Sequence, residues 1–185
     1  FGKDSTRNDM TAADRAAVVD VLREKAAAFW IDDTPRTVLR HLMHDTIPTG
    51  PPVRTPPHNL KGEEAQWVDE QLQKEVESGQ LERGNSEWAS PPFATKEFAA
   101  HKRQRKRRVV VDYRRVNART LRAIYHVRNA DCIIRSIIGS ARFSFLDACK
   151  GFNQILNTQR TKKMLAIWAR AGQFLPVCLT FGPTN

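Results

Sequence analysis

The chain has 185 residues, 41% of them hydrophobic, and carries 30 Lys and Arg against 20 Asp and Glu, a formal net charge of +10. This length can bury a sizeable core. No run of about 18 apolar residues occurs, so the sequence predicts no membrane span. The three Cys residues show no metal-binding spacing, which predicts reduced core thiols in an intracellular protein rather than disulfides or a zinc site.

The excess positive charge is concentrated in one stretch. Residues 101–122 hold ten Lys and Arg and one acid, whereas residues 61–90 hold eight acids and three bases. A local basic patch is typical of a contact with a polyanion. We therefore predict RNA or DNA binding by the cations of this run, namely Lys102, Arg103, Arg105, Lys106 and Arg107. A nuclear-import signal and a solvated, disordered loop are alternative interpretations of the same run.

The first 60 residues predict a helix followed by an extended connector. Thr11 and Asp14 resemble a capping box, and apolar residues at helical spacing predict a helix over residues 12–29. Residues 46–60 are rich in Pro, which lacks a backbone donor, so we expect an extended connector there. Residues 1–45 are accordingly predicted to be a helical segment and residues 61–185 a separate domain.

The remaining elements predict an α+β domain with a hairpin-rich antiparallel sheet. Amphipathic helices are expected over residues 61–78 and 130–138, each stopped by a Gly. Apolar, β-branched runs predict two pairs of strands. The first pair covers residues 93–96 and 108–113, with the basic run at its tip, and the second covers residues 164–169 and 173–179.

Asp147 is the leading candidate for a catalytic and metal-binding residue. It ends the apolar run F-S-F-L-D, which predicts a strand, and a Lys-Gly corner carrying Phe152 follows. A carboxylate at a strand end is a hard oxygen donor suited to Mg²⁺. The alternative is a carboxylate that only caps the turn after the strand.

Several sequence blocks agree in order and spacing with those of one protein family. Residues 86–92 read S-E-W-A-S-P-P, residues 111–117 V-D-Y-R-R-V-N and residues 139–147 G-S-A-R-F-S-F-L-D. Residues 172–174 read G-Q-F, and residues 181–185 read F-G-P-T-N. These blocks resemble S-x-W-A-S-P-V, V-D-Y-R-x-L-N, G-A-x-x-F-S-x-L-D, G-x-Y-E-F and F-G-L-T-N of gypsy-type LTR-retrotransposon reverse transcriptases. The resemblance extends from about residue 46 to the last residue and implies fingers and the first half of a palm.

The resemblance also implies roles for individual residues. Asp147 would bind Mg²⁺ for catalysis. Arg108 would contact the incoming triphosphate, for which guanidinium geometry is suited. The other implied nucleotide-binding residues are Lys96, Phe152, Phe181 and Gly182. An ordinary solvated lysine is the alternative for Lys96, and a core aromatic is the alternative for Phe152. Asp112 and Arg114 are predicted to hold the fold from one strand face.

The 185 residues contain no Y-x-D-D block, which the family uses for paired carboxylates. Two-metal phosphoryl transfer needs several carboxylates around the ions. We therefore expect weak or no Mg²⁺ binding and no polymerase activity from this chain alone, and the ends resemble cuts through a longer polypeptide. The resemblance predicts an RNA-directed DNA polymerase fragment. Alternatives are a non-catalytic structural or nucleic-acid-clamping subunit, whose protein partner would cover the open palm edge, and a binder of another polyanion or an acidic partner surface.

Overall fold

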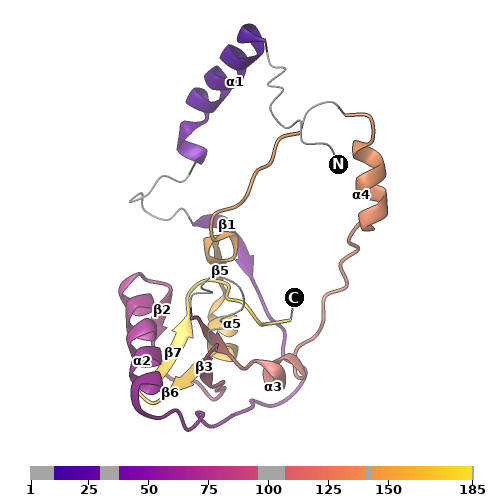
Figure 1. Ribbon diagram of the computed structural model, residues 1–185. Coiled ribbons are helices and arrows are strands. Elements are labelled where there is room, and N and C mark those ends of the chain that lie inside the picture. Colours follow the sequence, from indigo (N-terminus) through magenta and orange to yellow (C-terminus); the bar gives the residue numbers. More distant parts are fainter. Residues whose placement is uncertain (1–10, 30–37, 96–106, 141–142, 185) are drawn as a thin grey trace. The chain divides into compact units, whose positions relative to one another are not determined.

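The computed structural model describes residues 11–29, 38–95, 107–140 and 143–184 (Figure 1). The chain divides into two compact units, Phe1–Arg36 and Thr37–Asn185. In the first unit, helix α1 spans Ala12–Glu24 and a 3₁₀ turn, η1, spans Ala26–Ala28. The capping box is present, since Thr11 Oγ1 accepts from the Asp14 amide at 3.1 Å and Asp14 accepts from the Thr11 amide at 3.3 Å. The predicted helix therefore begins where expected but ends earlier, with a 3₁₀ turn in its place.

The described residues of the second unit form three small sheets. An antiparallel sheet has the order β2-β7-β6 and comprises Leu81–Arg83, Gly172–Pro176 and Ile167–Ala169. Strands β3, Pro92–Ala94, and β4, Val109–Val111, form the predicted antiparallel hairpin. Strands β1, Leu39–His44, and β5, Ile155–Asn157, pair in parallel and were not predicted. The short helices are α3, Arg114–Asn117, α4, Ala130–Ile137, and α5, Gln159–Met164, and η2 is a 3₁₀ turn over Gly151–Gln154.

Helix α2, Gly62–Glu77, covers the three-stranded sheet with one apolar face (Figure 1). Ala65, Val68 and Leu72 of this face are at most 3% exposed. Val68 and Leu72 pack in one cluster with Leu81, Ala94, Ile167, Ala169 and Phe174. The helix ends because Gly79 adopts φ +72°, a left-handed conformation that suits a residue without Cβ. This cluster anchors both the sheet and the β3–β4 hairpin.

A second cluster lies around Tyr113, just after β4. Tyr113 is buried with Val53, Trp88, Val116, Met164 and Leu165, and its hydroxyl donates to the Leu165 carbonyl at 2.9 Å. Desolvation by this burial raises the pKa of Tyr113. The cluster therefore joins α3 to the end of α5.

The Pro-rich connector, residues 46–60, contains no helix, bends at residues 49–51 and pairs with neighbouring segments of the second unit. The Thr55 amide donates to the Ala89 carbonyl at 2.9 Å, and the Ala89 amide donates to Val53 at 3.0 Å. Near its start, the Thr49 amide donates to the Arg119 carbonyl at 2.8 Å. Backbone pairing with neighbouring loops replaces the hydrogen bonds that Pro prevents within a helix.

The predicted strand ending at Asp147 is absent. Residues 143–148 have no regular secondary structure, and Phe145 is 96% exposed. Within the described ranges no second strand pairs with this run, and an unpaired strand leaves its backbone groups without partners. The apolar composition of this segment therefore favours a strand, but no described strand forms backbone hydrogen bonds with it.

Two further expectations need correction. Met164 ends α5 instead of opening a strand, because Thr158 caps this helix by accepting from the Thr161 amide at 3.2 Å. The three Cys residues were expected in the core, but only Cys178 is buried, whereas Cys132 is exposed and Cys149 is half-buried. No helix among the described residues is long and apolar enough to cross a bilayer.

Candidate functional site

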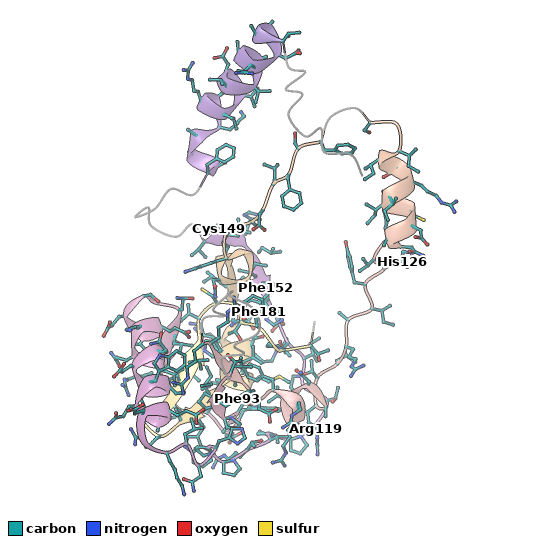
Figure 2. All side chains as sticks on the ribbon, viewed as in Figure 1. Phe93, Arg119, His126, Cys149, Phe152 and Phe181 are labelled. Carbon is teal, nitrogen blue, oxygen red and sulfur yellow. The ribbon has the colours of Figure 1, made fainter. Side chains whose placement is uncertain are left out.

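Two predicted site residues, Phe152 and Phe181, meet although they lie far apart in sequence. Their ring centroids are 4.6 Å apart at an interplanar angle of 53°. Figure 2 shows them where η2 approaches residues 181–184, the C-terminal turn. Phe152 is 48% and Phe181 71% exposed, so much of each ring remains free for another group. An exposed aromatic pair offers an apolar face to a flat ring or a sugar.

The local backbone brings the two rings together. Lys150 opens η2 with φ 49°, a left-handed conformation that few non-Gly residues adopt, and the chain turns there. The Leu179 amide donates to the Ile155 carbonyl at 2.8 Å, and Asn153 Nδ2 donates to the Leu179 carbonyl at 3.4 Å. These bonds tie η2 and β5 to the segment just before Phe181.

Gly182 is a third predicted site residue, and its backbone conformation and close neighbours favour a residue without Cβ. Its φ is +106°, and a Cβ added there would lie 3.3 Å from Tyr113 Cδ2. Its carbonyl accepts from Asn117 Nδ2 at 2.9 Å. The turn that carries Phe181 therefore lies directly against α3 and the Tyr113 cluster.

A groove of about 450 Å³ opens beside this turn. Its walls come from the connector, the β3–β4 hairpin, α3 and the C-terminal turn, and its lining residues are His58, Phe93, Val111, Asp112, Tyr113, Arg114, Asn117 and Gly182. His58 and Phe93 meet edge to face at 5.9 Å. The groove thus combines aromatic rings with one exposed guanidinium, a lining suited to nucleobases and phosphates.

Asp112 and Arg114 form a two-bond ion pair at the groove. Arg114 Nε and Nη2 donate to the two Asp112 carboxylate oxygens at 2.8 and 2.6 Å. The hydrogen bond from Arg114 lowers the pKa of Asp112 to about 2 despite partial desolvation. The two residues do not share a strand face as predicted, because Asp112 follows β4 and Arg114 begins α3. Their role in holding the fold stays a prediction.

Arg107 and Arg108, two arginines with predicted binding roles, lie in different settings. The Arg107 guanidinium stacks over the Trp67 ring at 4.7 Å and lies 3.8 Å from Glu64, both on α2. Arg108 has an exposed side chain, while its amide donates to Thr95 Oγ1 at 3.1 Å and its carbonyl accepts from the Thr95 amide at 2.9 Å. The other predicted cations, Lys96, Lys102, Arg103, Arg105 and Lys106, lie outside the described residues.

Asp147 is exposed on the irregular segment after α4. Across the described ranges, no three His, Cys, Asp or Glu side chains gather as a metal would require. One carboxylate on an irregular segment does not fit the multi-carboxylate cage of a two-metal centre. The described residues therefore do not fit a bound Mg²⁺, and no catalytic step through the metal follows from them.

The lining residues that were not predicted as site residues include His58, Phe93 and Asn117. Phe93 was assigned only to a strand and His58 to the end of the connector. Asn117 stands at the end of the V-D-Y-R-R-V-N block, and that position was the only available signal. The contacts of all three depend on segments distant in sequence.

The sequence matches no protein-family model. It is 28% identical over 118 residues to the retrovirus-related Pol polyprotein from transposon 297 of Drosophila melanogaster, covering 64% of this chain and 11% of that protein. It is 25% identical over 130 residues to the enzymatic polyprotein of figwort mosaic virus, covering 70% and 19%. The chain thus spans less than a fifth of these curated relatives.

Solved structures show the same relation at the level of the fold. The prototype foamy virus protease-reverse transcriptase aligns with 95% of this chain and 23% of its own, with a TM-score of 0.73 and 18% identity. The foamy viral protease-reverse transcriptase in complex with an RNA/DNA hybrid aligns with 95% and 23%, with a TM-score of 0.69 and 15% identity.

The chain has a reverse-transcriptase-like fold. Its mixture of helices and strands is consistent with the α+β class, and its sequence relatives are Pol and enzymatic polyproteins. The groove and the Phe152–Phe181 pair thus lie on a reverse-transcriptase-like scaffold.

Proposed function

We propose that this chain is the fingers and first part of the palm of a gypsy-type RNA-directed DNA polymerase, and that it binds a nucleotide and a nucleic-acid strand. The observation that carries the proposal is the meeting of Phe152 with Phe181, beside the Gly182 groove. These residues come from sequence blocks that resemble one family, and they lie on a fold of that kind.

In the proposed nucleotide site, the Phe152 and Phe181 rings contact the sugar and base of the incoming nucleotide. The left-handed Gly182 leaves the pocket wall without a side chain. Arg108 and Lys96 supply positive charge to the triphosphate, because cationic side chains bind phosphate oxygens by charge-assisted hydrogen bonds.

The nucleic-acid strand lies in the groove, where Phe93 offers a stacking face and the Arg114 guanidinium, 87% exposed, offers charge. Foamy viral protease-reverse transcriptases of the same fold have been solved with an RNA/DNA hybrid and with double-stranded DNA. Cations of the basic run extend this contact along the backbone by releasing counterions.

Asp147 is proposed as the first carboxylate of a polymerase centre whose other ligands are not brought to it by the residues that the structure describes. We therefore expect this chain alone to extend no primer, and we propose a protein partner over the exposed apolar residues of α4 and the segment after it.

Photo-crosslinking tests the nucleotide site. An azido-labelled dATP, irradiated with the chain and mapped by mass spectrometry, is expected to label peptides that contain Phe152 or Phe181. Excess unlabelled dATP should abolish the labelling. Labelling confined to α1, or labelling that unlabelled dATP leaves unchanged, would refute the site.

A non-catalytic nucleic-acid clamp is the second candidate, and the anchoring of Arg107 favours it. The Arg107 guanidinium stacks on Trp67 of α2, so one cationic side chain of the basic run is held against a helix. Hybrid binding that survives Asp147→Ala but is lost when Arg103, Arg105 and Arg107 become Gln supports the clamp. Primer extension on an RNA template with Mg²⁺, abolished by Asp147→Ala, would overturn it.

A further inference from the structure

Asn117 joins α3 to the C-terminal turn through both atoms of its side-chain amide. Asn117 Nδ2 donates to the Gly182 carbonyl at 2.9 Å, and Asn117 Oδ1 accepts from the Thr184 amide at 2.9 Å. The two bonds lie on either side of Pro183, which has no amide hydrogen of its own. Because one atom must donate and the other accept, only one orientation of the amide satisfies both.

This turn carries Phe181, whose ring meets Phe152. Phe181 is 71% exposed, so core packing restrains its position little. Its neighbour Gly182, by contrast, is confined, since its backbone is left-handed and an added Cβ would approach Tyr113 at 3.3 Å. The backbone on the C-terminal side of Phe181 is therefore set by the contacts of Gly182 and Thr184, and Asn117 supplies a hydrogen bond to each.

We infer that Asn117 is a positioning residue that orients Phe181 against Phe152 for nucleotide binding. The inference rests on the proposed nucleotide site. Asn117 acts through the turn and does not itself stack on the nucleotide, since its amide is committed to the two backbone groups. It therefore sets the geometry of the aromatic pair through the backbone of the turn.

Two substitutions distinguish the hydrogen bonds of Asn117 from the effect of its side-chain volume. Asn117→Asp keeps the shape but replaces the donor to the Gly182 carbonyl with a second acceptor, which sets two oxygens against each other. Asn117→Ser is shorter and removes both long-reach bonds without adding charge. Losing one or two neutral hydrogen bonds should weaken nucleotide binding by about threefold to tenfold.

The experiment measures binding of fluorescently labelled dATP by anisotropy in the wild type, Asn117→Asp, Asn117→Ser, Phe181→Ala and the Asn117→Ser/Phe181→Ala double variant. Asn129→Ala is the matched control, because Asn129 only caps α4 by accepting from the Asp131 amide. Amide hydrogen exchange at Thr184 is measured in parallel. We expect weaker binding and faster Thr184 exchange in both Asn117 variants, wild-type binding in the control, and a double variant no weaker than Phe181→Ala.

Each outcome decides between the two proposals. If the wild type binds no labelled dATP, the nucleotide site fails and the inference falls with it. If the wild type binds and the Asn117 variants bind equally well, or Thr184 exchange is unchanged, only the inference is overturned. A double variant whose losses add would also overturn it, because Asn117 would then act independently of Phe181.

Discussion

At the scale of single residues, backbone conformation and local charge hold the candidate site in place. Gly182 and Gly79 both adopt left-handed conformations, but their surroundings differ. A Cβ would meet Tyr113 at 3.3 Å at Gly182, whereas it would meet nothing within 4 Å at Gly79. This difference separates the cost of backbone strain from the cost of crowding.

Gly182→Ala is therefore expected to destabilise the second unit more than Gly79→Ala. The Gly79 variant carries only the strain of a left-handed Ala, about 1 kcal/mol, and the Gly182 variant adds crowding for a total of about 2 kcal/mol. Urea unfolding measures both free energies. Equal losses would show that Tyr113 yields to the added methyl group.

Asp112 should make stability depend on pH. Its pKa is lowered to about 2 in the folded chain, so its contribution is present above the ordinary carboxyl pKa of about 4 and is lost as the pH falls to about 2. Because the Arg114 partner is exposed, solvent screening keeps the contribution of the pair small. Asp112→Asn should lower the unfolding free energy modestly at pH 6 and by less near pH 2. A pH-independent difference in urea titrations would contradict this linkage.

At the scale of elements, the second unit is stabilised by the packing of α2 on its sheet. Leu72 is 1% exposed in that cluster, whereas Leu146 is 82% exposed on the segment that was predicted as a strand. The two leucines therefore compare a buried position with an exposed one in the same chain.

Leu72→Ala should cost about 2–4 kcal/mol, because it removes buried methyl groups and leaves a cavity. Leu146→Ala should change the unfolding free energy by less than about 0.5 kcal/mol. Thermal or urea unfolding of both variants checks this. A large loss for Leu146→Ala would mean that residues 143–147 form the buried strand predicted from their sequence.

Strands that pair with a neighbour in the sequence could be predicted, and strands whose partners are distant in the sequence could not. The β6–β7 hairpin is marked by Gly172 at φ +121°, β4 is the β-branched run V-V-V, and β3 carries the aromatic Phe93. Strand β1 reads L-R-H-L-M-H, without alternation, and its partner β5 lies more than 100 residues away. Phe152, Phe181 and Gly182 were proposed as site residues from their motifs. The role of Asn117 was not, because it depends on two backbone groups at the other end of the unit.

At the scale of the whole molecule, the net charge of +10 predicts salt-dependent nucleic-acid binding. If the chain makes about four phosphate contacts, raising the salt concentration from about 50 to about 200 mM should weaken its binding to an RNA/DNA hybrid on the order of 100-fold. Replacing Arg103, Arg105 and Arg107 with Gln should flatten this slope in anisotropy titrations. The matched control replaces Arg15, Arg23 and Lys25 of the first unit, and an equal flattening there would show that net charge, not the basic run, governs binding.

The central claim is that Phe152 and Phe181 form a nucleotide site, and an equilibrium titration with labelled dATP tests it most directly. Phe29→Ala is the matched control, since Phe29 is an exposed aromatic of the first unit. We predict saturable binding by the wild type and by Phe29→Ala, and at least about tenfold weaker binding by Phe152→Ala/Phe181→Ala, because base and sugar stacking on aromatic rings contributes about 1–3 kcal/mol. Equal affinity in all three proteins, or no binding by the wild type, would contradict the claim.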